Sequence, residues 1–147
     1  MAIWMESFTV DDLNAASRHT MAEYCGMRFT GFGDGWLEGT VPFDSHTEGM
    51  AGVLHPGALA MLAETLGSVA ANLCVDRSAR VCLGQTLSVN HTEPIGSGPI
   101  SAKASVVAIL NRSQIWDIEI TDACGAKVCV ACLTVAVIER AIEPGRS

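Results

Sequence analysis

The sequence is poor in aromatic residues and in positive charge. Phe, Trp and Tyr make up only 5% of the chain, so its core must be built from Val, Leu, Ile, Ala and Met. Nine Lys and Arg residues stand against sixteen Asp and Glu residues, a formal net charge of -7. A chain with this charge is not attracted as a whole to nucleic acid or to an anionic membrane, so we expect neither as a partner. A small anionic ligand is still compatible, because a few local Arg or Lys residues can hold a phosphate.

The sequence also lacks the patterns of export and of a metal site. Its first residues show no basic segment followed by a long apolar run, so we expect no secretory signal and a cytoplasmic location. The six cysteines have no framework spacing. Cys129 and Cys132 form a C-x-x-C, but they fall in a strand-like run, where residues three apart face opposite sides. We therefore expect buried free thiols and no metal site at this pair.

What the chain has in quantity is aliphatic sequence. Hydrophobic residues make up 49% of it and charged residues 17%. With 147 residues it is long enough to bury a sizeable core, and we expect a single domain over residues 1–147. The mean hydropathy of +0.31 predicts that part of the apolar surface lies in a subunit interface.

The order of the expected elements indicates one sheet and one long helix. Short helical turns are expected over residues 10–24, and alternating runs at 27–32 and 36–41 predict a hairpin around Gly33-Asp34-Gly35. After a polar loop, a helix is predicted over residues 56–75, with a proline at its start. Four strand-like runs follow, at residues 81–92, 100–110, 113–121 and 127–137. This order predicts an α+β fold in which an antiparallel sheet covers the helix.

The long helix carries a single charged side chain. Between residues 56 and 75, Glu64 is the only acidic or basic residue. It forms a polar stripe with Thr65, Ser68 and Asn72, because these positions share one face of a helix. Two interpretations are open: the stripe faces water, as on any amphipathic helix, or it faces a pocket or a partner subunit. The second places the carboxylate where its chemistry is concentrated.

His55 stands directly before this helix. The first N–H groups of a helix have no partner within it, so those of Gly57 and Ala58 are predicted to be free to bind an oxyanion or a carbonyl. His55 itself is open to two interpretations, a helix-cap or core histidine and a catalytic one. Helix geometry does not relate it to Glu64, because it lies outside the helical repeat.

Several motifs, in order along the chain, resemble those of a known family. The run Gly52-Val53-Leu54-His55-Pro56-Gly57 is similar to G-L-L-H-G-G, and Leu62-Ala63-Glu64-Thr65-Leu66-Gly67-Ser68 is similar to L-A-E-[ST]-x-G-S. Further similar stretches are Val89-Asn90-His91, Asn111-Arg112-Ser113-Gln114-Ile115-Trp116 and Cys132-Leu133-Thr134. The set resembles the hot-dog acyl-CoA thioesterases, most closely the PaaI-like branch with the dihydroxynaphthoyl-CoA thioesterases. The resemblance implies the hot-dog fold, an antiparallel sheet wrapped around one central helix.

The resemblance also implies roles for single residues. Glu64 takes the position of the nucleophile or general base, and Ser68 that of the hydroxyl that holds the attacking water or the substrate. His55 corresponds to a histidine near the thioester carbonyl, with the backbone of Gly57 beside it. His91 corresponds to a histidine that lines the same cleft.

The implied substrate is an acyl-CoA, hydrolysed without a cofactor at a site shared by two subunits. In such enzymes Glu64 of one subunit faces His55 of the other, which implies a homodimer or a homotetramer built as a dimer of dimers. Thr65, next to the carboxylate, is expected to contact the substrate. Basic side chains are expected to meet the CoA phosphates, and the candidates are Arg77, Arg80 and Arg112.

Two positions depart from the family pattern. Pro56 replaces a glycine whose N–H polarises the thioester carbonyl, and a proline has no N–H. Loss of one such donor typically costs about 10²–10³ in rate. Gly49 replaces a glutamine six residues before His55, where Glu48 or His46 is available instead. Pro56, Gly49 and Glu48 are therefore expected at the substrate, with altered contacts.

Three functions follow from these features. The first is a thioesterase with a modified oxyanion hole, and the second is a non-catalytic acyl-CoA-binding protein that kept the hot-dog dimer. The third is another hot-dog activity, such as a hydratase, whose usual Asp and His motif is not found here. Glu64 together with Ser68 favours the first, because binding alone does not need the carboxylate.

Overall fold

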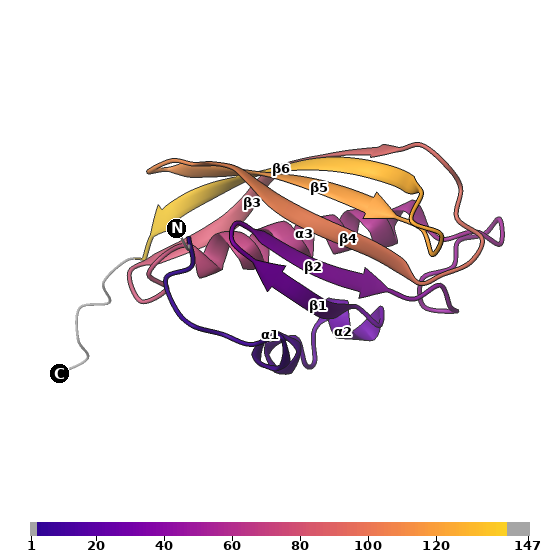
Figure 1. Ribbon diagram of the computed structural model, residues 1–147, viewed down its shortest axis with the longest axis horizontal. Helices are drawn as coiled ribbons and strands as arrows, with labels where there is room; N and C mark the ends of the chain where they lie inside the picture. Colours follow the sequence, from indigo (N-terminus) through magenta and orange to yellow (C-terminus); the bar gives the residue numbers. More distant parts are fainter. Residues whose placement is uncertain (1–2, 141–147) are drawn as a thin grey trace.

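A computed structural model describes residues 3–140 and places one long helix against a six-stranded sheet (Figure 1). The helices are α1 (Val10–Ala16), α2 (Met21–Tyr24) and α3 (Pro56–Leu73). The strands are β1 (Arg28–Gly33), β2 (Trp36–Val41), β3 (Arg80–His91), β4 (Ile100–Ile109), β5 (Ser113–Thr121) and β6 (Lys127–Glu139). The predicted elements are all present, and α3 ends two residues earlier than expected because Cys74 caps it.

The strand order is β1-β2-β4-β5-β6-β3, and every neighbouring pair is antiparallel. The sheet curves around α3, while α1 and α2 lie beside β1 at its border (Figure 1). The strands β1 and β3 form the two edges. The α+β prediction is thereby confirmed, with the sheet wrapped around one helix.

The small residues of α3 explain how the sheet comes so close to it. Leu62, Leu66 and Ala70 are fully buried, at the spacing of one helical face. Gly67 lies between them, and a Cβ added there would come within 2.5 Å of Cδ2 of Leu133 on β6. The side chain of Leu133 therefore packs almost directly on the helix backbone at Gly67. A larger residue at this position would push the helix and the sheet apart.

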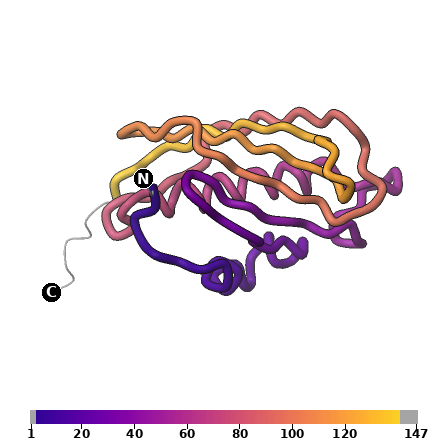
Figure 2. The backbone as a smooth tube through the Cα atoms, in the orientation of Figure 1, coloured from indigo at the N-terminus to yellow at the C-terminus, as the bar shows by residue number. Residues whose placement is uncertain are grey.

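Two of the three tryptophans pack against each other. Trp116 of β5 is fully buried, and the ring of Trp4 stacks on it with centroids 6.3 Å apart. Nε1 of Trp4 donates to the carbonyl of Gly33 at 2.9 Å, and the N–H of Met5 donates to the carbonyl of Leu73 at 2.8 Å. The N-terminal segment therefore runs past the hairpin to the C-terminal end of α3 (Figure 2).

All six cysteines are free thiols. Cys129 is buried on the inner face of β6 while Cys132 is half-buried, so the two do not share a face. The prediction of buried thiols is wrong for Cys124, which is exposed because the turn between β5 and β6 carries it away from the sheet.

Two further checks concern membranes and metals. None of the helices within residues 3–140 has the length and apolar character needed to cross a bilayer. Within the same residues, no three His, Cys, Asp or Glu side chains come together in a way that could hold a metal ion.

Candidate active site

The polar stripe of α3 lies at a boundary between core and surface. Glu64, Thr65, Ser68 and Asn72 are all half-buried. The stripe therefore neither faces open water nor disappears into the core. Each of these side chains, apart from Glu64 itself, is either part of a cavity wall or bound to a strand.

The carboxylate of Glu64 is held by its own helix and covered by β3. The hydroxyl of Ser68, one turn further along, donates to Oε1 of Glu64 at 2.6 Å. Gly84 of β3 also lies against this carboxylate, and an added Cβ at Gly84 would collide with it. Gly84 was not among the residues that the sequence singled out, although a glycine inside a β-branched strand is a signal of close approach.

Asn72 ties this part of β3 to the helix. Its Nδ2 donates to the carbonyls of Ser68 and Cys82, both at 2.9 Å, and its Oδ1 accepts from the N–H of Cys82 at 2.9 Å. The side-chain amide thus satisfies both backbone groups of one residue at the outer edge of β3. The strand is thereby fixed two residues before Gly84.

The buried side chain of Gln114 links β5 to the same part of α3. Gln114 of β5 is fully buried; its Nε2 donates to the carbonyl of Ala71 at 3.2 Å, and its Oε1 accepts from Nε1 of Trp116 at 3.1 Å. The thiol of Cys82 also donates to the carbonyl of Ala71, at 3.4 Å. The sequence motif contained Gln114 and Trp116, but their bond to the helix was not foreseen.

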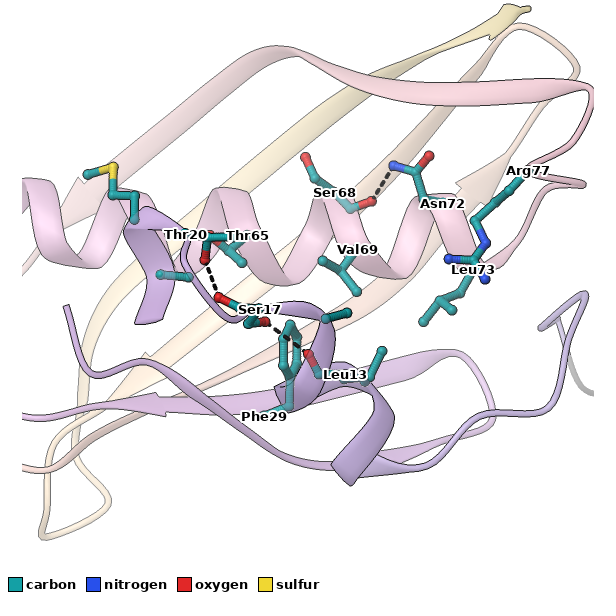
Figure 3. A pocket seen from close by; sticks show the side chains of 13 residues that line it. Leu13, Ser17, Thr20, Phe29, Thr65, Ser68, Val69, Asn72, Leu73 and Arg77 are labelled. Atoms are coloured by element: carbon teal, nitrogen blue, oxygen red, sulfur yellow. Dashed lines mark hydrogen bonds between the residues drawn. The ribbon is translucent and has the colours of Figure 1, made fainter. Parts of the chain in front are cut away.

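An apolar cavity of about 420 Å³ opens beside the stripe. It lies between α3 on one side and α1 and α2 on the other (Figure 3). Thr65 and Ser68 form part of its wall, Phe29 lies across from them, and Arg77 stands at one end, paired with Glu6 at 2.8 Å. The hydroxyl that binds Glu64 thus also borders a space large enough for an organic group.

His55 is the N-cap of α3. Its Nδ1 accepts a hydrogen bond from the N–H of Gly57 at 2.8 Å, and its carbonyl accepts from the N–H of Ala58 at 2.9 Å. The prediction that these two amides are free is therefore wrong, because the cap uses both. Since Nδ1 accepts, the proton of the neutral ring lies on Nε2, which is left as a donor on an exposed side chain.

The loop before His55 is held by backbone bonds. Gly49 donates to the carbonyl of Val53 at 2.7 Å, and a Cβ at Gly49 would lie 3.4 Å from Cα of His55. Glu48 is exposed and forms an isolated bridge with Leu54. The proximity of Gly49 to His55 agrees with their spacing in the sequence. His46 points elsewhere, since it binds Asp44 at 3.4 Å and packs on Tyr24.

The remaining predicted residues lie in two other cavities. His91, at the end of β3, lines a cavity of about 280 Å³ with Pro56 at the start of α3. Arg112 lines one of about 450 Å³ with Arg80 and Glu139, where the β4–β5 turn meets the ends of β3 and β6. The structure therefore forms three groups: the carboxylate group, the histidine group at the helix start, and the arginine group.

The first two groups are apart within one chain. Glu64 lies eight residues after Pro56 on α3, which corresponds to about 12 Å along the helix axis. The carboxylate and His55 therefore lie at different levels of the helix within one chain.

The comparisons with known proteins decide the family. The model described as "Thioesterase superfamily" matches residues 51–129, which contain all of α3, β3, β4 and β5. The chain belongs to the thioesterase superfamily. Its predicted reaction class, hydrolysis of a thioester, and its hot-dog fold are thereby confirmed.

Individual members of the superfamily are similar over nearly the whole chain. The 1,4-dihydroxy-2-naphthoyl-CoA hydrolase of Escherichia coli K12 is 36% identical over 136 residues, 92% of this chain and 99% of that protein. The proofreading thioesterase EntH of Cronobacter sakazakii is 37% identical over 136 residues, 92% of this chain and 98% of that protein. The crystal structure of a thioesterase from Haemophilus influenzae superposes with a TM-score of 0.92 at 32% identity, covering 97% of this chain and 99% of that one.

Proposed function

We propose that this thioester hydrolase cleaves acyl-CoA to the free acid and CoA, with Glu64 as its catalytic carboxylate and residues 1–147 as one hot-dog domain. Water supplies the oxygen of the acid, the C–S bond breaks, and the thiolate leaves and is protonated. Glu64 either takes a proton from that water or attacks the carbonyl carbon itself. No cofactor takes part in this hydrolysis.

The observation that carries the proposal is the bond between Ser68 and Glu64 at the wall of the apolar cavity. Ser68 binds one oxygen of the carboxylate and orients the group. The cavity of about 420 Å³ takes the acyl group, and its lining of Leu13, Phe29 and Val69 suits an aromatic or a short to medium aliphatic group. Thr65 on the same wall contacts that group.

The thioester carbonyl is polarised by the histidine group. Nε2–H of His55 is the donor on offer, because Nδ1 is already bound to Gly57. Pro56 contributes no N–H, and Gly57 contributes one only when the ring of His55 turns away. The side chain of His55 therefore takes over part of what a backbone amide does in an oxyanion hole. Gly49 lies against the Cα and Cβ of His55, and Glu48 forms a bridge with Leu54, the residue before it. His91 lines a cavity together with Pro56.

The reaction site is shared between two copies of the chain. The edge strand β3 has no neighbour on its outer side among the described strands, and beyond Cys82 its backbone is open to pairing. Two β3 edges paired about a two-fold axis bring the carboxylate group of one copy toward the histidine group of the other. The separation of about 12 Å along one α3 supports such an arrangement. The resulting homodimer can pair again into a tetramer.

The nucleotide part of CoA binds at the arginine group. Arg80 and Arg112 outnumber Glu139 in a cavity of about 450 Å³, so this part of an otherwise acidic protein attracts phosphates. Arg77 is less suited, because it already pairs with Glu6.

The first experiment measures thiol release from a panel of aromatic and aliphatic acyl-CoAs. Wild type is expected to cleave at least one of them, and Glu64→Gln, which keeps the shape but not the charge, is expected to lower kcat by about 10³ or more. Glu119→Gln, an exposed carboxylate on the outer face of β5, serves as the control and is expected to be fully active. An active Glu64→Gln variant would refute the role of Glu64. A wild type that binds acyl-CoA without cleaving it would support the acyl-CoA-binding function instead.

A second experiment tests the shared site. Glu64→Gln and His55→Ser are each expected to keep at most about 1% of the wild-type activity alone. Refolding a mixture of the two should restore activity, because one site of each mixed dimer is intact. Random pairing predicts about a quarter of the wild-type specific activity. If the mixture stays inactive while mixed dimers are present, both residues act within one subunit and the shared site is wrong.

A further inference from the structure

We infer that Gly84 of β3 is a positioning residue, whose missing side chain leaves the space in which the Glu64 carboxylate sits. This inference rests on the proposed function, because it concerns the same carboxylate. It deepens that proposal by naming a second residue, besides Ser68, that sets where the carboxylate oxygens lie.

The contact between the two residues is direct. The three atoms nearest to a Cβ built on Gly84 all belong to the carboxylate of Glu64: Oε1, then Cδ at 2.8 Å and Oε2 at 2.9 Å. A real Cβ does not approach other atoms so closely, so any other residue at position 84 must displace the carboxylate. The displaced oxygen is the one that Ser68 binds.

The backbone gives no other reason for a glycine at this position. Gly84 is not among the glycines with positive φ, which are Gly26, Gly35, Gly52 and Gly125. Its φ is therefore open to any residue, and a glycine in a strand interior is otherwise unfavourable. What remains is close approach, and the group that approaches is the catalytic carboxylate.

Two features of β3 keep this contact in place. The Asn72 amide binds the N–H and C=O of Cys82, two residues before Gly84. Directly after Gly84, the register with β6 shifts, since Gly84 pairs with Val135 and Thr86 with Thr134. Such bulges turn a strand locally and are frequent beside active sites. The strand is therefore held by α3 on one side and bent on the other at the point where it covers Glu64.

The energetic consequence is specific to catalysis. A Glu side chain can rotate away from a new methyl group with little cost to folding, because its end is flexible and half exposed. The same movement takes the carboxylate from Ser68 and from the substrate, and a misplacement of about 1 Å can cost 10²-fold in rate. A substitution at Gly84 therefore separates stability from activity, unlike one at Gly67, where a Cβ meets the packed side chain of Leu133.

The test compares Gly84→Ala with Gly96→Ala, an exposed glycine with no atom within 4 Å of an added Cβ. For Gly84→Ala, kcat on the best acyl-CoA is expected to fall about 10²-fold, with KM changed less than about threefold and Tm within about 3 °C of wild type. Gly96→Ala should match wild type in all three. A wild-type kcat for Gly84→Ala would overturn the inference.

A double-mutant cycle shows whether the loss acts through Glu64. Glu64→Asp shortens the side chain by one methylene and withdraws the carboxylate from Gly84. Adding Gly84→Ala to it should cost little further activity, so the two losses should not multiply. Losses that do multiply would mean that Gly84→Ala acts elsewhere, and the inference would be wrong. If Gly84→Ala alone fails to fold, adding Glu64→Ala should restore folding, because it removes the colliding group; no recovery would contradict the inference.

The outcome is separable from that of the proposed function. If Glu64→Gln is inactive and Gly84→Ala is fully active, the carboxylate chemistry stands and only the positioning role fails. If Glu64→Gln itself keeps the wild-type kcat, the proposed role of Glu64 fails, whatever the result for Gly84→Ala.

Discussion

The hydroxyl of Ser68 donates a hydrogen bond of 2.6 Å to Oε1 of Glu64, its neighbour one turn back on α3. This short bond links the only charged side chain of the helix to the wall of the apolar cavity. It has a close counterpart elsewhere in the chain, since the hydroxyl of Ser78 donates to Oδ1 of Asp76, also at 2.6 Å, on the exposed surface.

That pair allows a matched test of Ser68. Ser68→Ala is expected to lower kcat about tenfold, because the carboxylate loses the group that orients it, and one such bond to a charged partner is worth about 1.5–3 kcal/mol. Ser78→Ala removes an equally short bond away from the site and should leave thiol release unchanged. If Ser68→Ala lowers kcat no more than Ser78→Ala does, the bond from Ser68 does not orient the carboxylate for catalysis.

The two functions of His55, as cap and as donor, can be separated by substitution. Serine is a good N-cap, so His55→Ser should keep Tm near wild type, but it loses the Nε2–H donor and should lower kcat by about 10²–10³. His55→Ala should lose both, with a further loss of about 1 kcal/mol in the free energy of unfolding. Thermal unfolding and thiol release, measured side by side, check this. A fully active His55→Ser variant would leave His55 with the cap alone.

Substitution of Pro56 is expected to raise kcat rather than to lower it. Pro56→Gly supplies an N–H at the first position of α3, next to the Gly57 amide that His55 occupies. If a missing amide limits the rate, kcat should rise about tenfold or more. The free energy of unfolding should fall by about 1 kcal/mol, because glycine has more freedom in the unfolded chain. An unchanged kcat would mean that His55 already supplies sufficient polarisation.

Much of the fold and part of the site follow from local patterns. The strands were predictable because Val, Ile and Thr alternate in runs between turns, and α3 because a proline opens a long apolar helix with one polar stripe. Glu64 and Ser68 were predictable as a pair, because a spacing of four places them on one face.

The missed features depend on contacts between distant segments. Gly84 and Glu64 are twenty residues apart, and their contact depends on how the bulge brings β3 over α3. The bond of Gln114 to the carbonyl of Ala71 likewise joins β5 to the helix. The capped Gly57 amide was missed for another reason: a cap was one of the two interpretations of His55, but the sequence does not show which amide its side chain binds.

Gln114 should matter for stability rather than for chemistry. Gln114→Leu leaves Nε1–H of the fully buried Trp116 without its acceptor, which costs about 1–3 kcal/mol. Trp116→Phe removes the donor that Gln114→Leu leaves without an acceptor. In the Trp116→Phe background, Gln114→Leu should therefore lower the free energy of unfolding by less than it does in wild type. Chemical denaturation measures both. Strictly additive losses would show that the two side chains do not stabilise each other.

The thiol of Cys74 should make the protein less stable in alkaline solution. Burial, together with the nearby Cys82, raises the pKa of Cys74 from 9.0 to about 12. The folded chain therefore keeps this proton between pH 9 and 12 while the unfolded chain releases it, so the free energy of unfolding falls as pH rises through that range. Cys74→Ala should flatten this dependence, whereas Cys124→Ala, at an exposed turn, should not change it. Equal slopes for wild type and Cys74→Ala would show that another group controls the alkaline loss.

The same raised pKa should protect Cys74 from alkylation. Since the protonated thiol is the unreactive form, an alkylating reagent at pH 8 should modify Cys124 well before Cys74.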